Sequence, residues 1–302
     1  MGIATTLEPM TTPPAPAEAK PAATLLLVRD APSGLEVLVV KRSEHSSFMG
    51  GVYVFPGGGV DPQDSSPELA AACVGRSDAE ASAVLGLVAG GLAYWISAVR
   101  ELFEESGILL AHRSDGVPVS LAGERAAHFG AHRAALNART SSFVEMVLAE
   151  GLVLDVGAIA YNAHWITPTT AAKRFDTYFF VARAPEDQVA AHDEGETVAV
   201  EWVTPADALE RHRAGEIEMV LPTIRNLAFI GSFATTDELL AAAVALRDIP
   251  AILPRMVDTE EGPILLVPGD PGYDELPGAE DDPRRFPTAA RRRAVMENPP
   301  SG

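Results

Sequence analysis

The feature that most limits how this chain can fold is an uncharged stretch of 19 residues, from Ala81 to Val99, that runs directly into Arg100 and three glutamates. Such a stretch is long enough to span a bilayer, so a membrane helix is one interpretation. Three glycines interrupt it: Gly86, Gly90 and Gly91. Because the charged residues continue the helical pattern, we instead expect a pair of buried helices and no membrane span.

Residues 92–107 show the periodicity of an amphipathic helix, with Gly107 placed to end it. At about 100° per residue, Glu101, Glu104 and Glu105 fall within one narrow arc, opposite the apolar side. Like charges at this spacing repel each other, which favours a cation between them. Mg²⁺ or Mn²⁺, which prefer oxygen ligands, are the candidates, with these three glutamates as metal ligands. A solvated acidic helix face is the alternative.

A glycine turn precedes the uncharged stretch. A strand over 52–55 is expected to end at Pro56 and to run into Gly57, Gly58 and Gly59, where backbone amides can approach a ligand closely. Gly58 is therefore a candidate for substrate binding. Arg100 lies on the flank of the acidic arc and could hold one carboxylate in a fixed orientation.

Together the two segments resemble the Nudix box, in which a glycine, five residues, an acid and a spacer precede Arg-Glu-apolar-x-Glu-Glu-x-Gly-apolar. Gly58 and Asp64 match the first half, and residues 100–108 match the second half at every specified position. Asp64 replaces the usual Glu, which shortens the reach of that acid. The spacer has 35 residues where the family has seven, so an insert of 28 residues divides the box.

That insert is similar to the one in the peroxisomal coenzyme A diphosphatase type of Nudix protein. The resemblance continues through residues 165–168, 174–177 and 266–270. A second pattern, from another coenzyme A pyrophosphatase branch, is matched only in part over residues 38–55, where Val40 and Ser47 replace the expected Thr and Arg. This partial match gives modest support to coenzyme A as the substrate.

The resemblance implies an α/β (α+β) Nudix fold, a mixed β-sheet sandwiched between helices, with a helical insert at about 65–93 and a C-terminal extension. We expect one Nudix hydrolase domain over 22–270, between flexible, Pro-rich tails at 1–21 and 271–302. Strands are expected at 24–28, 35–41, 52–55, 156–166, 174–182, 197–203 and 263–267, and further helices within 124–150 and at 205–213, 221–230 and 237–247.

The activity that the resemblance implies is metal-dependent hydrolysis of a diphosphate linkage in a nucleoside diphosphate derivative, with a coenzyme A or acyl-coenzyme A substrate as the first choice. A nucleotide sugar or a dinucleotide is the alternative substrate. A ligand sensor that keeps the fold without catalysis is the rival from another class, but such proteins usually lose one or more of the helix acids. All three are present here, which favours an enzyme.

Glu105 and Glu104 are accordingly the candidate catalytic residues on the helix. The general base is expected on a later loop, where Glu196 lies six residues before Trp202 in a segment similar to the family's acid-bearing one; Glu194 is the second candidate. Arg42 and Arg174 could contact substrate phosphates, although an arginine at a strand end is often a surface residue.

Two histidines stand apart from this pattern. His128 and His132 are four residues apart on a predicted helix, a spacing that suits a metal ion. No third ligand follows them in the sequence, so we expect surface histidines.

The composition of the chain limits the kinds of partner that it is expected to bind. The 42 acidic residues outnumber the 23 basic ones, for a net charge of −19, which is the wrong sign for binding nucleic acid or an anionic membrane. Cys73 is the only cysteine, which excludes a disulfide framework within one chain. The sequence opens without a cationic, apolar leader, so we expect a cytoplasmic location. The expected partner is a small molecule, and a homodimer is a further possibility.

Overall fold

The long strand β1 (Ala19–Ala31) organises the central sheet of the computed structural model, which describes residues 16–44, 50–192, 197–260 and 262–276. Its apolar segment from Leu25 to Val28 is fully buried, as expected for a strand covered on both faces. A tight turn leads into the antiparallel strand β2 (Gly34–Arg42), with Gly34 at a positive φ of 112°. The strands expected at 24–28 and 35–41 are confirmed, and both are longer than expected.

Within the described residues, eight strands form this sheet, in the order β10-β2-β1-β9-β8-β11, with β3 attached to β2 and β4 attached to β1. β1 is parallel to β9 and β8 is parallel to β11, whereas the remaining pairs are antiparallel. The mixed sheet is thus confirmed. The other bounds are β3 (Tyr53–Val54), β4 (Gly57–Gly59), β8 (Ala160–Ile166), β9 (Arg174–Arg183), β10 (Thr197–Val203) and β11 (Ala251–Ile252).

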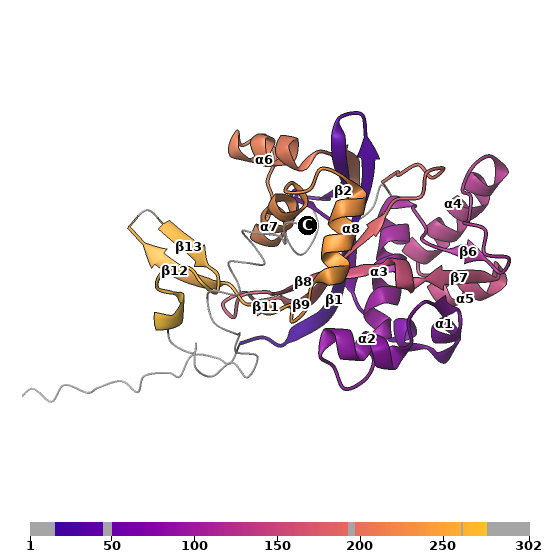
Figure 1. The fold of residues 1–302 in the computed structure, drawn as a ribbon, viewed down its shortest axis with the longest axis horizontal. Helices are drawn as coiled ribbons and strands as arrows, with labels where there is room; N and C mark the ends of the chain where they lie inside the picture. Colours follow the sequence, from indigo (N-terminus) through magenta and orange to yellow (C-terminus); the bar gives the residue numbers. More distant parts are fainter. Residues whose placement is uncertain (1–15, 45–49, 193–196, 261, 277–302) are drawn as a thin grey trace, which may run out of the picture.

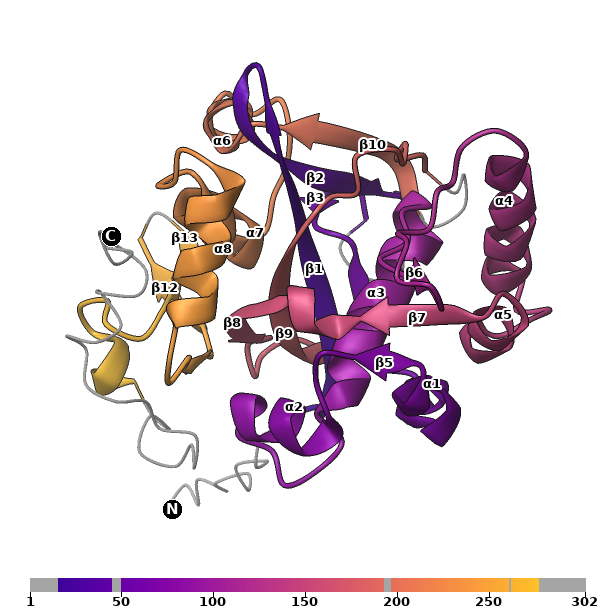
Figure 2. The ribbon, with the colours of Figure 1, turned by 45° about the vertical axis from the view of Figure 1, so that its right-hand side comes forward.

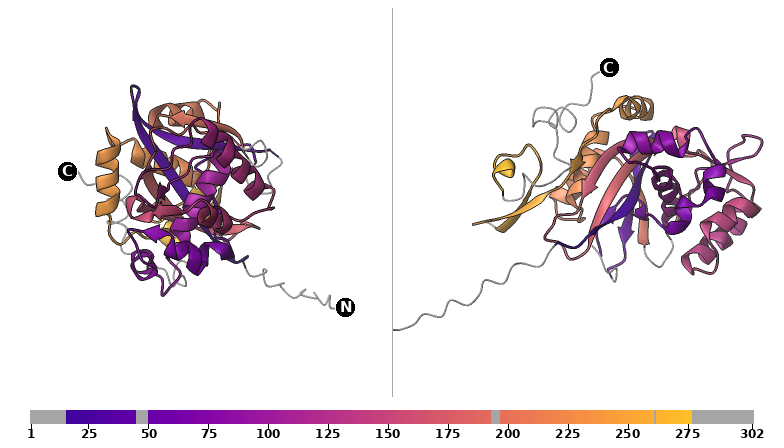
Figure 3. Two further views of the ribbon diagram at one scale, coloured as in Figure 1. Left: turned by 90° about the vertical axis from the view of Figure 1, so that its right-hand side faces the viewer. Right: turned by 90° about the horizontal axis from the view of Figure 1, so that it is seen from below.

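Helices cover the sheet on two sides, as expected (Figures 1 and 2). On one side α3 (Leu92–Ser106) packs the side chains of Trp95, Val99 and Phe103 against the sheet in one large apolar core. On the other side α6 (Pro205–Arg213), α7 (Leu221–Ile230) and α8 (Thr236–Ala245) bury a second core. The left panel of Figure 3 shows these two groups of helices with the strands between them.

The uncharged stretch forms the predicted helical pair, α2 (Asp78–Leu85) and the start of α3. Gly86 ends α2 in the left-handed conformation, and Gly107 does the same for α3, with φ angles of 71° and 74°. Among the residues that the structure describes, no helix has both the length and the apolar character needed to cross a membrane.

The insert is not wholly helical. After the short 3₁₀ helix η1 (Pro62–Ser65) and α1 (Pro67–Ala71), strand β5 (Cys73–Val74) pairs in parallel with β7 (Leu152–Asp155), which also pairs with β6 (His112–Arg113). These strands are too short for a clear period-two pattern, so the sequence did not indicate them. They join the insert to the segment that carries α4 (Glu124–Asn137) and α5 (Phe143–Ala149).

Ordered contacts extend a few residues beyond each end of the expected domain. Ala19–Pro21 pair with β9 instead of belonging to a tail, because β1 gains ladder hydrogen bonds there that proline-rich composition does not reveal. At the other end, Tyr273 in η3 (Tyr273–Glu275) is buried, and its hydroxyl donates to the Leu253 carbonyl at 2.6 Å. Between Leu253 and Tyr273, the strands β12 (Arg255–Thr259) and β13 (Gly262–Leu266) form an antiparallel hairpin.

Candidate active site

The C-terminal half of α3 brings the three predicted acids to the glycine strand β4. Glu105 is buried, and its Oε2 accepts a hydrogen bond from the Gly57 backbone N–H at 3.1 Å. Its Oε1 lies 4.0 Å from Nη1 of Arg42, at the end of β2. Thr197, the first residue of β10, donates from its hydroxyl to the Glu105 carbonyl at 3.3 Å. Three strands therefore meet at Glu105.

Arg100 is the centre of the acidic cluster. Its Nε and Nη2 bind the two carboxylate oxygens of Asp64 at 2.9 Å each, and Nη2 also donates to the Gly59 carbonyl at 2.9 Å. Burial opposes the charged guanidinium, but the Asp64 hydrogen bonds and the charges of Glu101 and Glu104 outweigh it, so the pKa of Arg100 is raised. Arg100 thus stays charged inside the protein.

A cation does lie between two of the acids, and it is Arg100 itself. Its Nη1 donates to Glu101 at 2.8 Å and to Glu104 at 3.0 Å. The sequence placed Arg100 on the flank of the acidic arc with one carboxylate to orient. The long side chain instead folds back along α3 and bridges two carboxylates, as an i, i+4 pair allows.

One guanidinium does not neutralise this cluster. Burial raises the pKa of Glu101 to about 7, with Arg100 opposing and Glu104 adding to the shift. Burial also raises the pKa of Glu104. The negative charge of these groups is therefore costly without a further cation nearby. An all-oxygen set of glutamates that lacks sufficient positive charge suits the ligand preference of Mg²⁺ or Mn²⁺. Among the described residues, the ligand atoms of Glu101, Glu104 and Glu105 do not all lie within 4.8 Å of one another, so these three as ligands of one ion stay a prediction.

A side chain at Gly58 would displace the Glu101 carboxylate. A Cβ atom at Gly58 would lie 2.5 Å from the Glu101 carboxylate carbon, closer than such atoms approach each other in proteins. At Gly57 the same atom would lie 2.6 Å from the Ala23 carbonyl, because β4 pairs with β1. The structure therefore explains the glycines by close approach to a carboxylate and to a strand. Substrate binding at Gly58 stays a prediction.

Asp64 holds Arg100 and also shapes the turn that precedes the insert. Besides the two bonds to Arg100, its Oδ2 accepts from the Asp61 N–H at 2.8 Å, which closes a capping box at η1. Both oxygens are thus engaged, and the side chain is buried. In this arrangement Asp64 orients Arg100, and both of its oxygens accept hydrogen bonds.

The other residues predicted for the site do not all lie beside the acids of α3. Arg42 is beside Glu105, as described above. Arg174 donates to the carbonyls of Thr167 and Ala17, at 3.0 and 2.7 Å, and so ties the β8–β9 turn to the chain before β1. Its contact with substrate stays a prediction. Glu196 and Glu194 lie outside the residues that the structure describes.

Two residues at this site were missed by sequence reasoning. Arg133 and Asn137 of α4 donate from their side chains to the Glu104 carbonyl, at 2.9 and 3.3 Å. A positive charge beside the last carbonyls of α3 also complements the helix dipole. Nothing in the spacing pointed to them, because they lie about 30 residues after Glu104 on a separate helix.

Comparison with known proteins finds related sequences. The family model of the NUDT19 Nudix domain matches residues 76–230, just over half of the chain. A chicken (Gallus gallus) protein named acyl-coenzyme A diphosphatase NUDT19 is 31% identical over 285 residues, which cover 82% of this chain and 75% of the relative. The Xenopus laevis protein of the same name is 29% identical, covering 81% and 73%.

Solved structures support the fold as well. The crystal structure of a NUDIX hydrolase from Alicyclobacillus acidocaldarius superimposes with a TM-score of 0.62 at 27% sequence identity, covering 74% of this chain and 96% of the other. The expected sheet and helices therefore belong to a fold already seen in a solved enzyme structure.

Proposed function

The chain belongs to the Nudix hydrolases of the NUDT19 type, and from that premise we propose that it hydrolyses the diphosphate linkage of coenzyme A or an acyl-coenzyme A. Relatives named acyl-coenzyme A diphosphatase support this substrate class. The single observation that carries catalysis is the complete set of helix acids: Arg100 holds Glu101 and Glu104, and the Gly57 N–H of the glycine strand holds Glu105. A ligand sensor would not need all three.

In the proposed reaction, a water oxygen forms a bond to one phosphorus while the bond from that phosphorus to the bridging oxygen breaks. With coenzyme A the products are adenosine 3′,5′-bisphosphate and 4′-phosphopantetheine. A Mg²⁺ or Mn²⁺ ion held by Glu101, Glu104 and Glu105 would offset the charge on the bridging and leaving oxygens.

The protein's own groups have separate parts in this proposal. The Gly57 N–H fixes the Glu105 carboxylate, and Arg42 beside it brings positive charge that suits a substrate phosphate. Glu196 remains our candidate for the general base, with Glu194 second. The support is indirect: Thr197, next in sequence, contacts the carbonyl of Glu105.

The organisation of the whole chain is also a proposal. We propose one Nudix domain over 22–270, extended by the paired residues from Ala19 and by the segment around Tyr273. A cytoplasmic location is supported only by the single cysteine, which suits a reducing compartment, and cell fractionation tests it. The homodimer is tested by gel filtration with light scattering.

The deciding experiment is a substrate panel. The full-length protein with Mg²⁺ or Mn²⁺ is assayed on coenzyme A, an acyl-coenzyme A, a nucleotide sugar and a dinucleotide. We expect release of adenosine 3′,5′-bisphosphate from the first two with the highest kcat/KM. Glu105→Gln should lower that value by roughly 10²–10⁴-fold, the usual size of a lost acid–base or electrostatic group. Glu216→Gln, on an exposed turn, is the matched control and should leave it unchanged.

The results separate the alternatives. Turnover confined to the nucleotide sugar or the dinucleotide would overturn the coenzyme A substrate but keep the reaction type. Absence of turnover on all four compounds, together with saturable binding of one of them, would instead identify a ligand sensor.

A further inference from the structure

The structure supplies the third ligand that the sequence lacked beside His128 and His132. Glu150, the residue that caps the C-terminal end of α5, places its Oε1 2.7 Å from Nε2 of His128 and 3.1 Å from Nε2 of His132. The ligand atoms of the three residues all lie within 4.8 Å of one another. Within the described ranges of the chain, this is the one group of three or more such side chains that is so compact.

The donor set differs in chemistry from the acids of α3. Two imidazole nitrogens and one carboxylate oxygen suit Zn²⁺ and related transition metals, whereas Mg²⁺ prefers oxygen ligands. Zinc–nitrogen bonds of about 2.0–2.1 Å require the two Nε2 atoms to converge on one point. Both Nε2 atoms already converge on a single oxygen, Glu150 Oε1.

The rings are held in place by the packing of α4. Phe129, which lies between the two histidines in sequence, is almost fully buried and packs edge-on against Phe103 of α3, with ring centroids 6.4 Å apart. Its ring also contacts His128 and His132, at centroid distances of 5.5 and 5.8 Å. Phe129 therefore fixes the rotation of α4, which directs the two histidines toward the end of α5.

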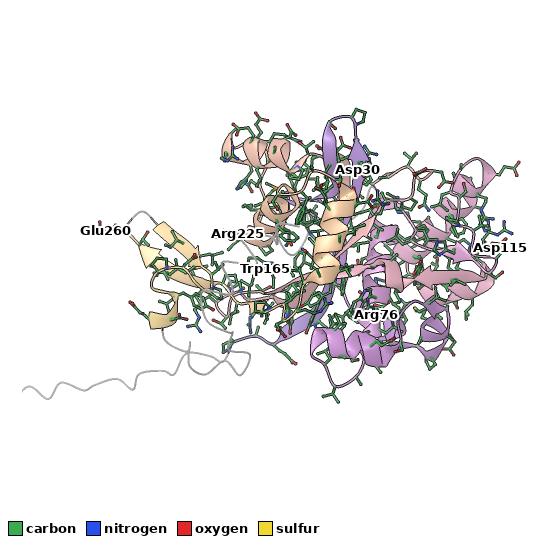
Figure 4. All side chains as sticks on the ribbon, in the orientation of Figure 1. Asp30, Arg76, Asp115, Trp165, Arg225 and Glu260 are labelled. Carbon is green, nitrogen blue, oxygen red and sulfur yellow. The ribbon has the colours of Figure 1, made fainter. Side chains whose placement is uncertain are left out.

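The cluster is open on one side. The His128 side chain is 54% exposed, while those of His132 and Glu150 are 23% and 19% exposed. An ion could thus enter from solvent and keep a water molecule as its fourth ligand. The labelled residue Asp115 in Figure 4 marks the outer edge of this part of the molecule, which Figure 1 shows to be formed by α4, α5, β6 and β7.

We propose that His128, His132 and Glu150 form a binding site for a transition-metal dication such as Zn²⁺, separate from the acids of α3. The bound ion links α4 to the end of α5. Because Arg133 and Asn137 of α4 hold the Glu104 carbonyl, the same ion braces the helix that supports the C-terminal end of α3.

The test uses the full-length protein, stripped of metal with a chelator and returned to excess Mg²⁺ so that hard-oxygen sites are filled. Zn²⁺ binding is measured by competition with a chromophoric zinc indicator, and Co²⁺ binding by its visible absorption. We expect the protein to bind one more Zn²⁺ than the double variant His128→Ala/His132→Ala. Glu150→Gln should weaken that Zn²⁺ by at least about 10-fold.

Two further variants locate the ion. His212→Ala, on α6, removes a histidine far from the cluster in sequence and should bind Zn²⁺ like the unaltered protein. Glu105→Gln should also bind Zn²⁺ like the unaltered protein, since the proposed zinc site does not use the acids of α3. Zn²⁺ should raise the melting temperature of both variants but not that of the double variant. Equal Zn²⁺ uptake and equal Co²⁺ spectra for the unaltered protein and the double variant would overturn the proposal, whatever the outcome of the substrate panel.

Discussion

Arg100 binds both carboxylate oxygens of Asp64 at 2.9 Å, and this pair joins the two halves of the divided box across 36 residues of sequence. The insert begins next to Asp64 and ends before α3, so it leaves and returns without separating the two side chains. An insert of this length is tolerated because the box is completed by a contact in space and not by a fixed spacer.

Removing Asp64 should therefore damage stability and activity together. Asp64→Ala leaves the buried guanidinium of Arg100 without its main partner, which should lower the free energy of unfolding by about 3–5 kcal/mol. Urea denaturation measures this loss. The control is Glu210→Ala, which removes an exposed partner of Arg213 and should cost less than about 1 kcal/mol. Similar losses for the two variants would contradict the role given to Asp64.

The neighbouring residues Gly58 and Gly59 provide a matched pair of test variants. Gly58→Ala should displace the Glu101 carboxylate, which lies 2.5 Å from the new Cβ atom, and so lower kcat/KM by roughly 10-fold or more while the protein still folds. At Gly59 the nearest atom to a new Cβ is the Pro21 carbonyl oxygen at 3.8 Å, so Gly59→Ala should retain activity. Steady-state kinetics and circular dichroism of both variants test this. Equal activity of the two would show that Glu101 does not need its present position.

The contact of α4 with α3 should contribute to stability. Arg133→Gln removes a charged donor from the Glu104 carbonyl and should lower the free energy of unfolding by about 1–2 kcal/mol. Arg113→Gln serves as its control, because Arg113 and its partner Asp115 are largely exposed and their pair should be worth less than about 1 kcal/mol. Thermal or urea unfolding distinguishes the two; an Arg133 variant as stable as the control argues against bracing by α4.

Cys73 should be unreactive in the folded protein. Burial raises the pKa of its thiol to about 12, above the ordinary value of 9.0, so the thiolate that attacks an alkylating reagent is scarce at pH 9. Alkylation at that pH should be on the order of 10²–10³-fold slower than in urea, as followed by mass spectrometry. Between pH 9 and 12 the folded state holds this proton more tightly than the unfolded state, so its contribution to stability falls as pH rises. Fast alkylation of the folded protein that is lost in Cys73→Ala would contradict the raised pKa of this thiol.

The amino-acid sequence by itself determined the local elements and the identity of the acids. The bounds predicted for β10, α6 and α7 are those observed, and α3 ends at Gly107 as expected. Helical periodicity, caps and β-branched runs act over a few residues, so they can be read along the chain. The same short-range rule placed three glutamates on one arc of α3, and the box pattern indicated the family.

The tertiary structure alone decided the partners of those residues. It paired β5 with β7 and β4 with β1, set Arg100 between Glu101 and Glu104, and brought Glu150 to the two histidines. Strands of two or three residues carry no clear periodic signal, and contacts across 18 to 81 residues depend on how whole elements pack. The direction of a long side chain such as Arg100 likewise follows from the charges that packing places around it, which is why the sequence named the acids but not the cation between them.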